Sequence, residues 1–463
     1  MYTLPKDTKI TNQIIMDVIS YNEKFKSRYD RLERYYFGKH DILERTKEDR
    51  LKNNKVVVNH AKYITDTNVG YLLGNPVDYQ VGKKDDGSPL YDIQPILDAY
   101  KKQTINDLDT EIAKDLSIFG VQYEYVYANE DAEPKSCEVD NRNTIIVYDD
   151  TVEHNKLFGI NYRPVYKGAT LQYYEVIYAD KSVKRTYKSY TRALKQEGKD
   201  EPHAFGDVPF IQYRNNAEMI GDFEPVDSLI DAYNLLQSDR VNDKEQLVDA
   251  ILCMYGMDFD EKDAEMLKES RMLANIPTDG KVEYLVKTLQ ENDVDILRQN
   301  LENDIHKISM VPNMSDENFV GNSSGVAIRY KLLAFEQNIK NKERYMEKGL
   351  MERFKLYNNF LTTKSQMQEV PIEEVDAVFK RNLPSNDFET SQMINNLADL
   401  VDTETLISQL SFIKDASEIV ELKKKEEEEK PTYDPEFADN EIDDANKNIE
   451  EISVPEDKIN IKQ

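Results

Sequence analysis

Apolar residues recur at three- and four-residue steps through the first 120 positions of the chain, the spacing of one face of an α-helix. This pattern predicts three helices, at residues 11–36, 58–73 and 91–119. The second helix ends at Gly74 and the third at Gly120, and glycine is typical of helix C-termini. The N-terminal region is therefore expected to be helical.

Between residues 121 and 213 the pattern changes to short runs rich in tyrosine and β-branched residues, separated by polar turns. These runs predict strands at residues 121–127, 144–148, 159–166, 171–178, 182–190 and 209–213. Tyrosine suits a sheet face that is apolar along the ring and wet at the hydroxyl. We expect one mostly antiparallel sheet of about five or six strands.

Longer helices return after residue 224 and enclose a small insert. Helical spacing covers residues 224–251 and 290–310. The segment between them has two strand-like runs and one short helical run, at residues 251–255, 282–286 and 260–271. A small α/β insert between two long helices is therefore predicted.

A polar stretch at residues 313–323 predicts a loop, and the longest helix is expected to follow it, from Ser324 to about Thr362. A helix of that length spans roughly 58 Å, which suggests a strut between regions. A solvent-exposed face with paired charges explains its cations, Lys331, Lys340, Lys342 and Arg344.

The C-terminal part of the chain is simpler. Residues 369–381 predict one more strand, and residues 386–425 predict short helices. From residue 426 the chain is rich in glutamate and poor in aromatic residues, so residues 426–463 are expected to be an acidic, disordered tail.

The charge balance narrows the classes of function. The 463 residues include 60 Lys and Arg against 88 Asp and Glu, a formal net charge of −28. Proteins that grip DNA do so with clustered Lys and Arg that displace counterions from phosphates, so this balance argues against gripping and leaves passage of DNA open. Residues 1–20 contain no apolar run of signal-peptide length, and no window approaches the apolar length of a membrane span.

Cysteine and histidine offer little for metal or redox chemistry. Cys137 and Cys253 lie far apart in the sequence and are expected to be buried free thiols. No two of the five histidines share helix spacing, so neither a metal site nor a cofactor is predicted.

Two short motifs could suggest an activity, and both have a simpler explanation. Gly321–Gly325 matches the G-x-S-x-G of hydrolases, but no histidine follows His306 to complete that chemistry, and a loop with Ser324 as a helix N-cap explains it. The acidic run at residues 258–263 lacks the ligands and the glycine of a calcium loop and fits a helix N-terminus. Because nucleotide-binding loops are also missing from the sequence, no enzyme is predicted.

The order of these parts and three local blocks of sequence resemble the portal proteins of long-tailed bacteriophages of Gram-positive hosts. The blocks are Asn53–Asn59 with Ala61–Pro76, Phe205–Asn216 with Asp231–Ser238, and Val311–Met314 with Asn322–Ile328. The resemblance covers residues 50–380 or so. It implies an α+β portal fold with long stem and wing helices, a mostly antiparallel wing sheet, a small α/β clip and a helical crown.

The resemblance also divides the chain into named parts. These would be the wing (1–223), a stem helix (224–251), the clip (252–289), a second stem helix (290–312), the tunnel loop (313–323), the long helix and wing strand (324–381), the crown (382–425) and the tail (426–463).

A function follows from the resemblance as an expectation. The chain would form a twelve-fold ring with itself at one capsid vertex, and double-stranded DNA would pass through its channel during packaging and ejection. The clip would meet the large subunit of the terminase and afterwards the head–tail adaptor, with capsid and scaffold proteins as further partners. The protein would belong to the virion, reside in the host cytoplasm during assembly, and involve no membrane.

The resemblance places candidate sites in two segments. The DNA-facing residues of the tunnel loop would be Asn313, Met314, Ser315, Asp316, Glu317, Asn318, Phe319, Val320, Gly321 and Asn322. Gly321 and Gly325 would be the hinges of that loop. The partner-binding residues of the clip would be Met254, Tyr255, Met257, Phe259 and Arg271.

Two other functions stay open at this point. The chain could be a ring-forming adaptor or scaffold without a DNA channel, or an acidic cytosolic enzyme with an unrecognised site. A ring with a central hole about 20 Å across, wide enough for a duplex, would separate a portal from both.

Overall fold

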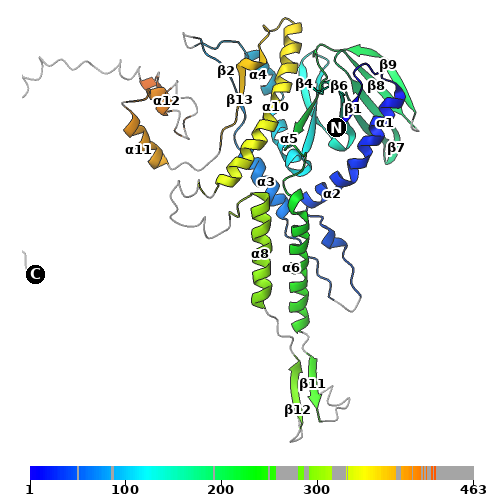
Figure 1. The fold of residues 1–463 in the computed structure, drawn as a ribbon, viewed down its shortest axis with the longest axis vertical. Coiled ribbons are helices and arrows are strands. Elements are labelled where there is room, and N and C mark those ends of the chain that lie inside the picture. The colour runs from blue at the N-terminus through cyan, green and yellow to red at the C-terminus, as the bar shows by residue number, and fades with distance from the viewer. Residues whose placement is uncertain are drawn as a thin grey trace, which may run out of the picture. The chain divides into compact units, whose positions relative to one another are not determined.

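The structure of this chain is a computed structural model that places most of its residues. It describes residues 1–48, 52–84, 88–190, 193–248, 251–256, 280–285, 291–314, 330, 332–381, 387–398, 400–407, 410, 413, 419–420 and 422–423. The chain divides into two compact units, Met1–Asn382 and Leu383–Gln463. Helices and sheets both contribute to the first unit, as the predicted α+β class requires (Figure 1).

The helices of the first unit follow the predicted pattern with two differences. They are α1 (Asn12–Asn22), α2 (Lys26–Tyr36), α3 (His60–Leu73), α4 (Gln94–Lys101), α5 (Ile105–Phe119), α6 (Asp227–Val248), α8 (Glu291–Ser309) and α10 (Leu333–Thr363). A 3₁₀ turn at Glu23–Phe25 separates α1 from α2. The single helix predicted for residues 91–119 is wrong, because Thr104 has a left-handed backbone (φ 51°) that ends α4 and precedes α5.

The strand region forms two sheets rather than the one sheet predicted. The larger has the order β1-β5-β6-β7-β8-β9, and the smaller has the order β10-β3-β4. The strands of the first are β1 (Tyr2–Leu4), β5 (Thr144–Asp149), β6 (Lys156–Lys167), β7 (Thr170–Ala179), β8 (Val183–Ser189) and β9 (Leu194–Pro202). Those of the second are β10 (Phe210–Arg214), β3 (Val121–Ala128) and β4 (Pro134–Val139).

Register explains why the predicted sheet divides. β3 pairs antiparallel with both β10 and β4, so the predicted strands 121–127 and 209–213 bond to each other and not to the larger sheet. The two sheets meet where Gly159 of β6 faces Phe210 of β10, because a Cβ at this glycine would overlap the phenylalanine ring. All neighbouring strands of the larger sheet are antiparallel except β1, which runs parallel to β5.

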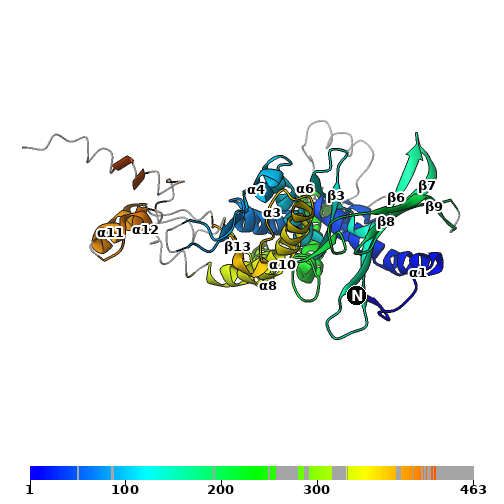
Figure 2. The same cartoon turned by 90° about the horizontal axis from the view of Figure 1, so that it is seen from above.

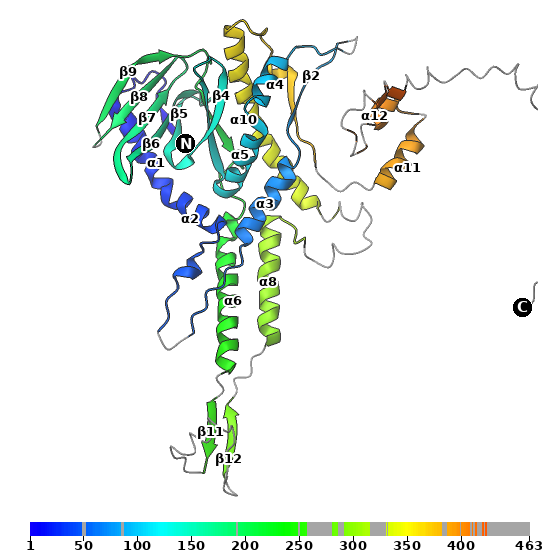
Figure 3. The same ribbon diagram turned by 180° about the vertical axis from the view of Figure 1, so that it is seen from behind.

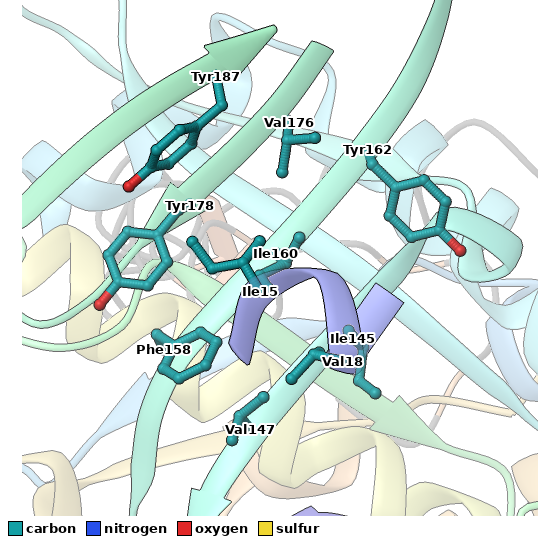
Figure 4. Close-up of a cluster of buried hydrophobic side chains, with 10 residues drawn as sticks. All are labelled: Ile15, Val18, Ile145, Val147, Phe158, Ile160, Tyr162, Val176, Tyr178 and Tyr187. Atoms are coloured by element: carbon teal, nitrogen blue, oxygen red, sulfur yellow. The ribbon is translucent and has the colours of Figure 1, made fainter. Parts of the chain in front are cut away.

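One face of the larger sheet is covered by α1, which lies next to its strands in Figure 2. Ile15 and Val18 of the helix are buried against the sheet, as Figure 4 shows. The sheet contributes apolar and tyrosine side chains to the same cluster, namely Ile145, Val147, Phe158, Ile160, Tyr162, Val176, Tyr178 and Tyr187. The tyrosine-rich strands thus form one part of the core, as the sequence pattern indicates.

The longest described helix, α10, lies inside the first unit. It covers Leu333–Thr363 and spans roughly 46 Å. The predicted start, Ser324, lies outside the described residues. One face of it is buried from Phe335 to Leu361, and it contacts α3, α4, β4, β10 and β13. The predicted strut is therefore wrong: this helix is a central element of the core.

Two further pairs of strands complete the first unit. α6 and α8 run side by side (Figures 1 and 3), and between them in sequence come the antiparallel strands β11 (Ile251–Tyr255) and β12 (Lys281–Leu285). The short helix predicted at residues 260–271 lies outside the described residues. β13 (Val375–Val378) confirms the strand predicted within 369–381 and pairs with β2 (Asp78–Val81).

The second unit contains two short helices among its described residues, α11 (Asp387–Leu397) and α12 (Thr403–Ile407). They agree with the short helices predicted for residues 386–425. The predicted acidic tail, residues 426–463, lies outside the described residues.

Candidate functional site

The helix pair α6 and α8 carries a surplus of negative charge. Each helix has five acidic residues and two Lys or Arg. Arg298 is bonded to Asp295 at 2.9 Å and to Glu302 at 2.7 Å, both on its own helix, and Arg240 of α6 reaches Asp295 at 3.5 Å. The bond from Arg298 lowers the pKa of Asp295, so this carboxylate stays ionised. The helix pair therefore presents a net negative surface.

Large apolar side chains are also exposed on this helix pair. Ile296 and Leu297 of α8 are 56% and 49% exposed, and Leu235 and Val241 of α6 are exposed as well. Between residues 292 and 309 of α8, only Ile305 and Ser309 are buried. In a single chain, these apolar groups stand in solvent.

An extended segment, residues 52–59, runs antiparallel along α6 and is called the strap here. Alternate backbone amides of the strap donate to short polar side chains of α6. The bonds join Asn54 N to Asn242 Oδ1 at 2.7 Å, Val56 N to Ser238 Oγ at 2.9 Å, and Val58 N to Asn234 Oδ1 at 2.8 Å. All three accepting residues are buried, so the strap satisfies groups that would otherwise be buried without partners.

The strap fits because two periods nearly coincide. Four residues of a helix rise about 6.0 Å, and two residues of an extended chain rise about 6.6 Å. Asn234, Ser238 and Asn242 recur every four residues, while the bonded amides recur every two. Short polar residues at this spacing on α6, together with a Val-Val-Val run in the strap, are a sequence signal of this contact that the helix and strand patterns do not predict.

Further contacts hold α6 to the N-terminal helices. Tyr35 of α2 donates to Asp231 at 2.7 Å, and Arg31 pairs with Asp227. Burial raises the pKa of Asp231, and the bond from Tyr35 partly offsets this rise. Asn234 also donates to Nδ1 of the buried His40 at 2.9 Å.

The end of α8 is held by α3. The hydroxyl of Tyr63 donates to the carbonyl of Pro312 at 2.9 Å and accepts from the amide of Met314 at 3.1 Å. His60 packs edge-on against His306 at a centroid distance of 5.8 Å. Burial, and then the nearby His306, lower the pKa of His60 to about 4, so its ring is neutral near pH 7.

Two of the predicted tunnel-loop residues lie at this anchored end. Asn313 donates to Glu302 of α8 at 3.0 Å, and Met314 is held through its amide. The other predicted loop residues, Ser315 to Asn322, and the hinge Gly325 lie outside the described residues.

Two of the predicted partner-binding residues lie on β11. Met254 and Tyr255 are opposite Val282 and Lys281 of β12, and the side chain of Tyr255 is 52% exposed. The other three, Met257, Phe259 and Arg271, lie outside the described residues.

Buried charges stabilise the core next to these elements. Arg353 of α10 is fully buried and bonds to Asp109 of α5 at 2.6 Å and to Glu124 of β3 at 2.8 Å. Lys342 is also buried, and it pairs with Asp222 and bonds to Asn68. The interpretation of Lys342 as part of a solvent-exposed face is therefore wrong, and burial lowers its pKa.

The described residues hold no group of three histidine, cysteine, aspartate or glutamate side chains arranged to bind a metal. Cys137 and Cys253 are free, as predicted, but half-buried rather than buried, and burial raises the pKa of the Cys137 thiol to about 11. The G-x-S-x-G motif and the acidic run 258–263 lie outside the described residues. Within the described part of the chain, no helix is long and apolar enough to span a membrane.

Comparison with known proteins explains this combination of elements. The profile of the family described as phage portal protein, SPP1 Gp6-like, matches residues 17–432. The portal protein of Bacillus phage SPP1 is 23% identical over 426 residues, which cover 85% of this chain and 82% of that protein. The portal protein of Clostridium phage phiCD119 is 23% identical over 228 residues, which cover 48% of this chain and 49% of that protein.

The match to the family spans the N-terminal helices, both sheets, the helix pair and α10. The resemblance found in the sequence is confirmed, over a longer range than residues 50–380. Portal proteins are structural components of the virion that form the capsid portal for DNA packaging, in an oligomeric ring. The chain therefore belongs to the SPP1 Gp6-like family of phage portal proteins.

Proposed function

We propose that this chain forms a twelve-fold ring at one capsid vertex, with α6 and α8 as the stem around a channel for DNA entry and exit. The observation that carries the proposal is the helix pair itself. Two long helices run side by side, are acidic, and are joined in sequence through the hairpin β11–β12. This is the arrangement that a channel wall with a separate docking element requires.

The charge of the helix pair supports passage rather than capture of DNA. Surplus carboxylates repel a duplex, and salt screens this repulsion over about 10 Å at 0.1 M. Lysine-rich walls would instead bind phosphates in a deep, salt-sensitive well. The cations Arg240 and Arg298 pair with carboxylates of the same helix pair, so they offer little to phosphate groups.

The exposed apolar residues of α6 and α8 support contact with neighbouring copies. Ile296, Leu297 and Leu235 stand in solvent in one chain. A ring would cover such groups between stems, because burying apolar surface is favourable.

The remaining parts receive roles that the resemblance implies. Residues 1–223 and 324–381 would be the wing, and residues 382–425 the crown. Residues 252–289 would be the clip, which meets the large terminase subunit during packaging and the head–tail adaptor afterwards. The exposed Tyr255 on β11 is a candidate contact for such a partner, since aromatic side chains often anchor interfaces.

Residues 313–323 would be the tunnel loop, the close contact with DNA. Its first residues are fixed by Tyr63 and Glu302, so the loop would start from a defined point near the end of α8. We assign groove or backbone contacts to Asn318, Phe319 and Asn322, with Gly321 and Gly325 as hinges.

The experiment is deletion of Met314–Asn322 from the portal of a packaging-competent phage. Rings are expected to assemble, because the deletion leaves the helix pair and the anchors at Pro312 and Asn313 intact, while packaged DNA falls at least about tenfold. Ring assembly is measured by end-on electron microscopy and packaging by nuclease-protected DNA. Deletion of the last nine residues, 455–463, is the control of equal length.

Three outcomes would contradict the proposal or part of it. Normal packaging by the loop deletion would exclude the role of the loop. Rings of the unaltered protein without a duplex-sized hole would indicate an adaptor or scaffold instead, and an unaltered protein that forms no ring would remove the portal function altogether.

A further inference from the structure

The first unit has a basic pocket although the chain is strongly acidic. A cavity of about 350 Å³ is lined by five Lys or Arg and only two acidic residues. Lys156 pairs with Glu352, and Lys355 pairs with Asp207 at 2.9 Å. The other three cations, Lys181, Arg214 and Lys348, have no carboxylate partner among the described residues. The pocket therefore keeps a local positive charge.

An acidic pocket of about 690 Å³ lies elsewhere on the same unit. Six acidic residues and two basic ones line it. Arg142 neutralises part of this charge by pairing with Glu33 at 2.8 Å and with Asp140 at 2.9 Å. Asp107 and Glu111 of α5 are exposed and form no ion pair within the described part of the chain. This pocket therefore keeps a local negative charge.

The small sheet separates the two pockets. Its order is β10-β3-β4, so β10 and β4 are its opposite edges. Gln212 and Arg214 of β10 line the basic pocket, whereas Ser136, Cys137 and Glu138 of β4 line the acidic one. One chain thus presents opposite charges at opposite edges of one sheet.

Rings require a contact between two different faces. In a cyclic assembly with more than two subunits, a patch on one copy meets another patch on the next, so the two patches must be complementary. Opposite charges steer such faces together and disfavour contact between like faces. The two pockets meet this requirement within a single chain.

We propose that neighbouring copies in the ring meet with the acidic pocket of one chain against the basic pocket of the next. The exposed side chains at the pockets, Asp107 and Glu111 on one copy and Lys181 and Lys348 on the other, are the contacting charges. This inference rests on the proposed function for the existence of the ring, and it adds which surfaces close it.

Charge reversal tests the contact. K181E/K348E makes both pockets acidic. D107K/E111K leaves four cations against three carboxylates in the acidic pocket at neutral pH, because burial raises the pKa of Asp115 to about 8 and keeps it protonated, so both pockets become basic. All four side chains are exposed and none has an ion-pair partner among the described residues, so each variant is expected to fold. Each variant alone should associate at least about tenfold more weakly than the unaltered chain, measured by sedimentation at 0.1 M salt.

Mixing the two variants is the sharper measurement. An alternating ring of the two places an acidic face against a basic face at every contact, so the mixture should recover association to within about threefold of the unaltered chain. The fourfold variant D107K/E111K/K181E/K348E should associate with itself for the same reason. K6E/K9E and E130K/D131K change the net charge equally at exposed positions outside both pockets and should leave association unchanged.

The outcomes separate this inference from the proposed function. If the unaltered chain forms rings and both K181E/K348E and D107K/E111K associate as strongly as it does, the proposed contact is wrong. The proposed portal function would then be unaffected. Two weakened variants that do not recover on mixing would also overturn the contact, because damage unrelated to pairing would explain them. Failure of the unaltered chain to form any ring would overturn the proposed function and this inference together.

Discussion

The helix α10 and the helix pair α6–α8 differ in how much of their apolar surface is buried within one chain. α10 buries one face along its length, and two of its charged residues, Lys342 and Arg353, are inside the core with their carboxylate partners. α8 has one buried apolar residue between 292 and 309, and Ile296 and Leu297 are exposed. The contacts of α10 are thus complete within one chain, whereas those of the helix pair are not.

This contrast predicts that α10 acts mainly on the stability of a single chain and that the helix pair acts mainly on assembly. Mutations in α10 should act on the folding of a single chain, since its neighbours are α3, α4, β10 and β13 of the same unit. Mutations on the exposed faces of α6 and α8 should act on the ring. The strap binds α6 and continues into α3, which contacts α10, so its mutations should show an intermediate effect.

The largest effect is expected from R353A. Removal of this guanidinium leaves Asp109 and Glu124 buried without their cation, which should lower the free energy of unfolding by about 3–5 kcal/mol. Urea denaturation at fixed protein concentration measures the change. R298A removes a partly exposed cation of α8 and should cost less than about 1 kcal/mol. Equal losses from both variants would remove the distinction between the two regions.

An intermediate effect is expected from N234A. This side chain accepts from Val58 in the strap and donates to His40, and its loss leaves buried groups unpaired. The free energy of unfolding should fall by about 1–3 kcal/mol. N292A, at an exposed position of α8, is the matched control and should be neutral. A neutral N234A would show that the strap contributes nothing to holding α6.

A pH-dependent effect on the free energy of unfolding is expected from Asp115 of α5. Burial, and then its contact with Glu138, raise the pKa of Asp115 to about 8 from 3.8. The folded state therefore holds a proton that the unfolded state releases, so this contribution to stability is complete below pH 3.8 and is lost as the pH rises towards 8. From pH 6 to 8 the loss should be at most about 1.4 kcal/mol per pH unit.

The measurement is the urea midpoint at pH 6, 7 and 8. D115N carries no titratable proton at this position and should flatten the pH dependence. E111Q removes an exposed carboxylate of the same helix and should leave the slope as it is. A slope unchanged by D115N would show that another group titrates.

The smallest effect on folding is expected from L297S. The leucine is half-exposed in a single chain, so the free energy of unfolding should change by no more than about 0.5 kcal/mol. Ring formation should weaken, because a polar group replaces apolar surface at the proposed contact between neighbouring copies. Sedimentation measures the ring. A variant with destabilised monomers and intact rings would place Leu297 in the core of one chain instead.

Periodic patterns in the sequence predict much of this fold. The helices α3, α6 and α8 and most strands follow from the spacing of apolar residues along the chain. The division of residues 91–119 could not be predicted, since Thr104 gives no signal for a left-handed backbone. The separate small sheet depends on pairing between β3 and β10, which lie far apart in the chain.

The candidate site, like the fold, is only partly predictable from the sequence. The helix pair and its acidic character are visible in the sequence, and so are the blocks that resemble portal proteins. The burial of Lys342 is not, because a lysine among acids in a helix has the same pattern whether its partner, here Asp222, is distant or four residues away. The charges of the two pockets likewise depend on β4, β10, α5 and α10 coming together in space.

The strap also sets where α6 can rest along its axis. The acceptors on α6 recur every four residues, and the amide donors of the strap recur every two. A displacement of α6 by about 6 Å would therefore bring two of the three acceptors opposite amides again. A displacement of half that distance would align none of them. The strap therefore allows α6 only a few discrete axial positions, and any sliding of α6 along the strap would proceed in steps of about 6 Å.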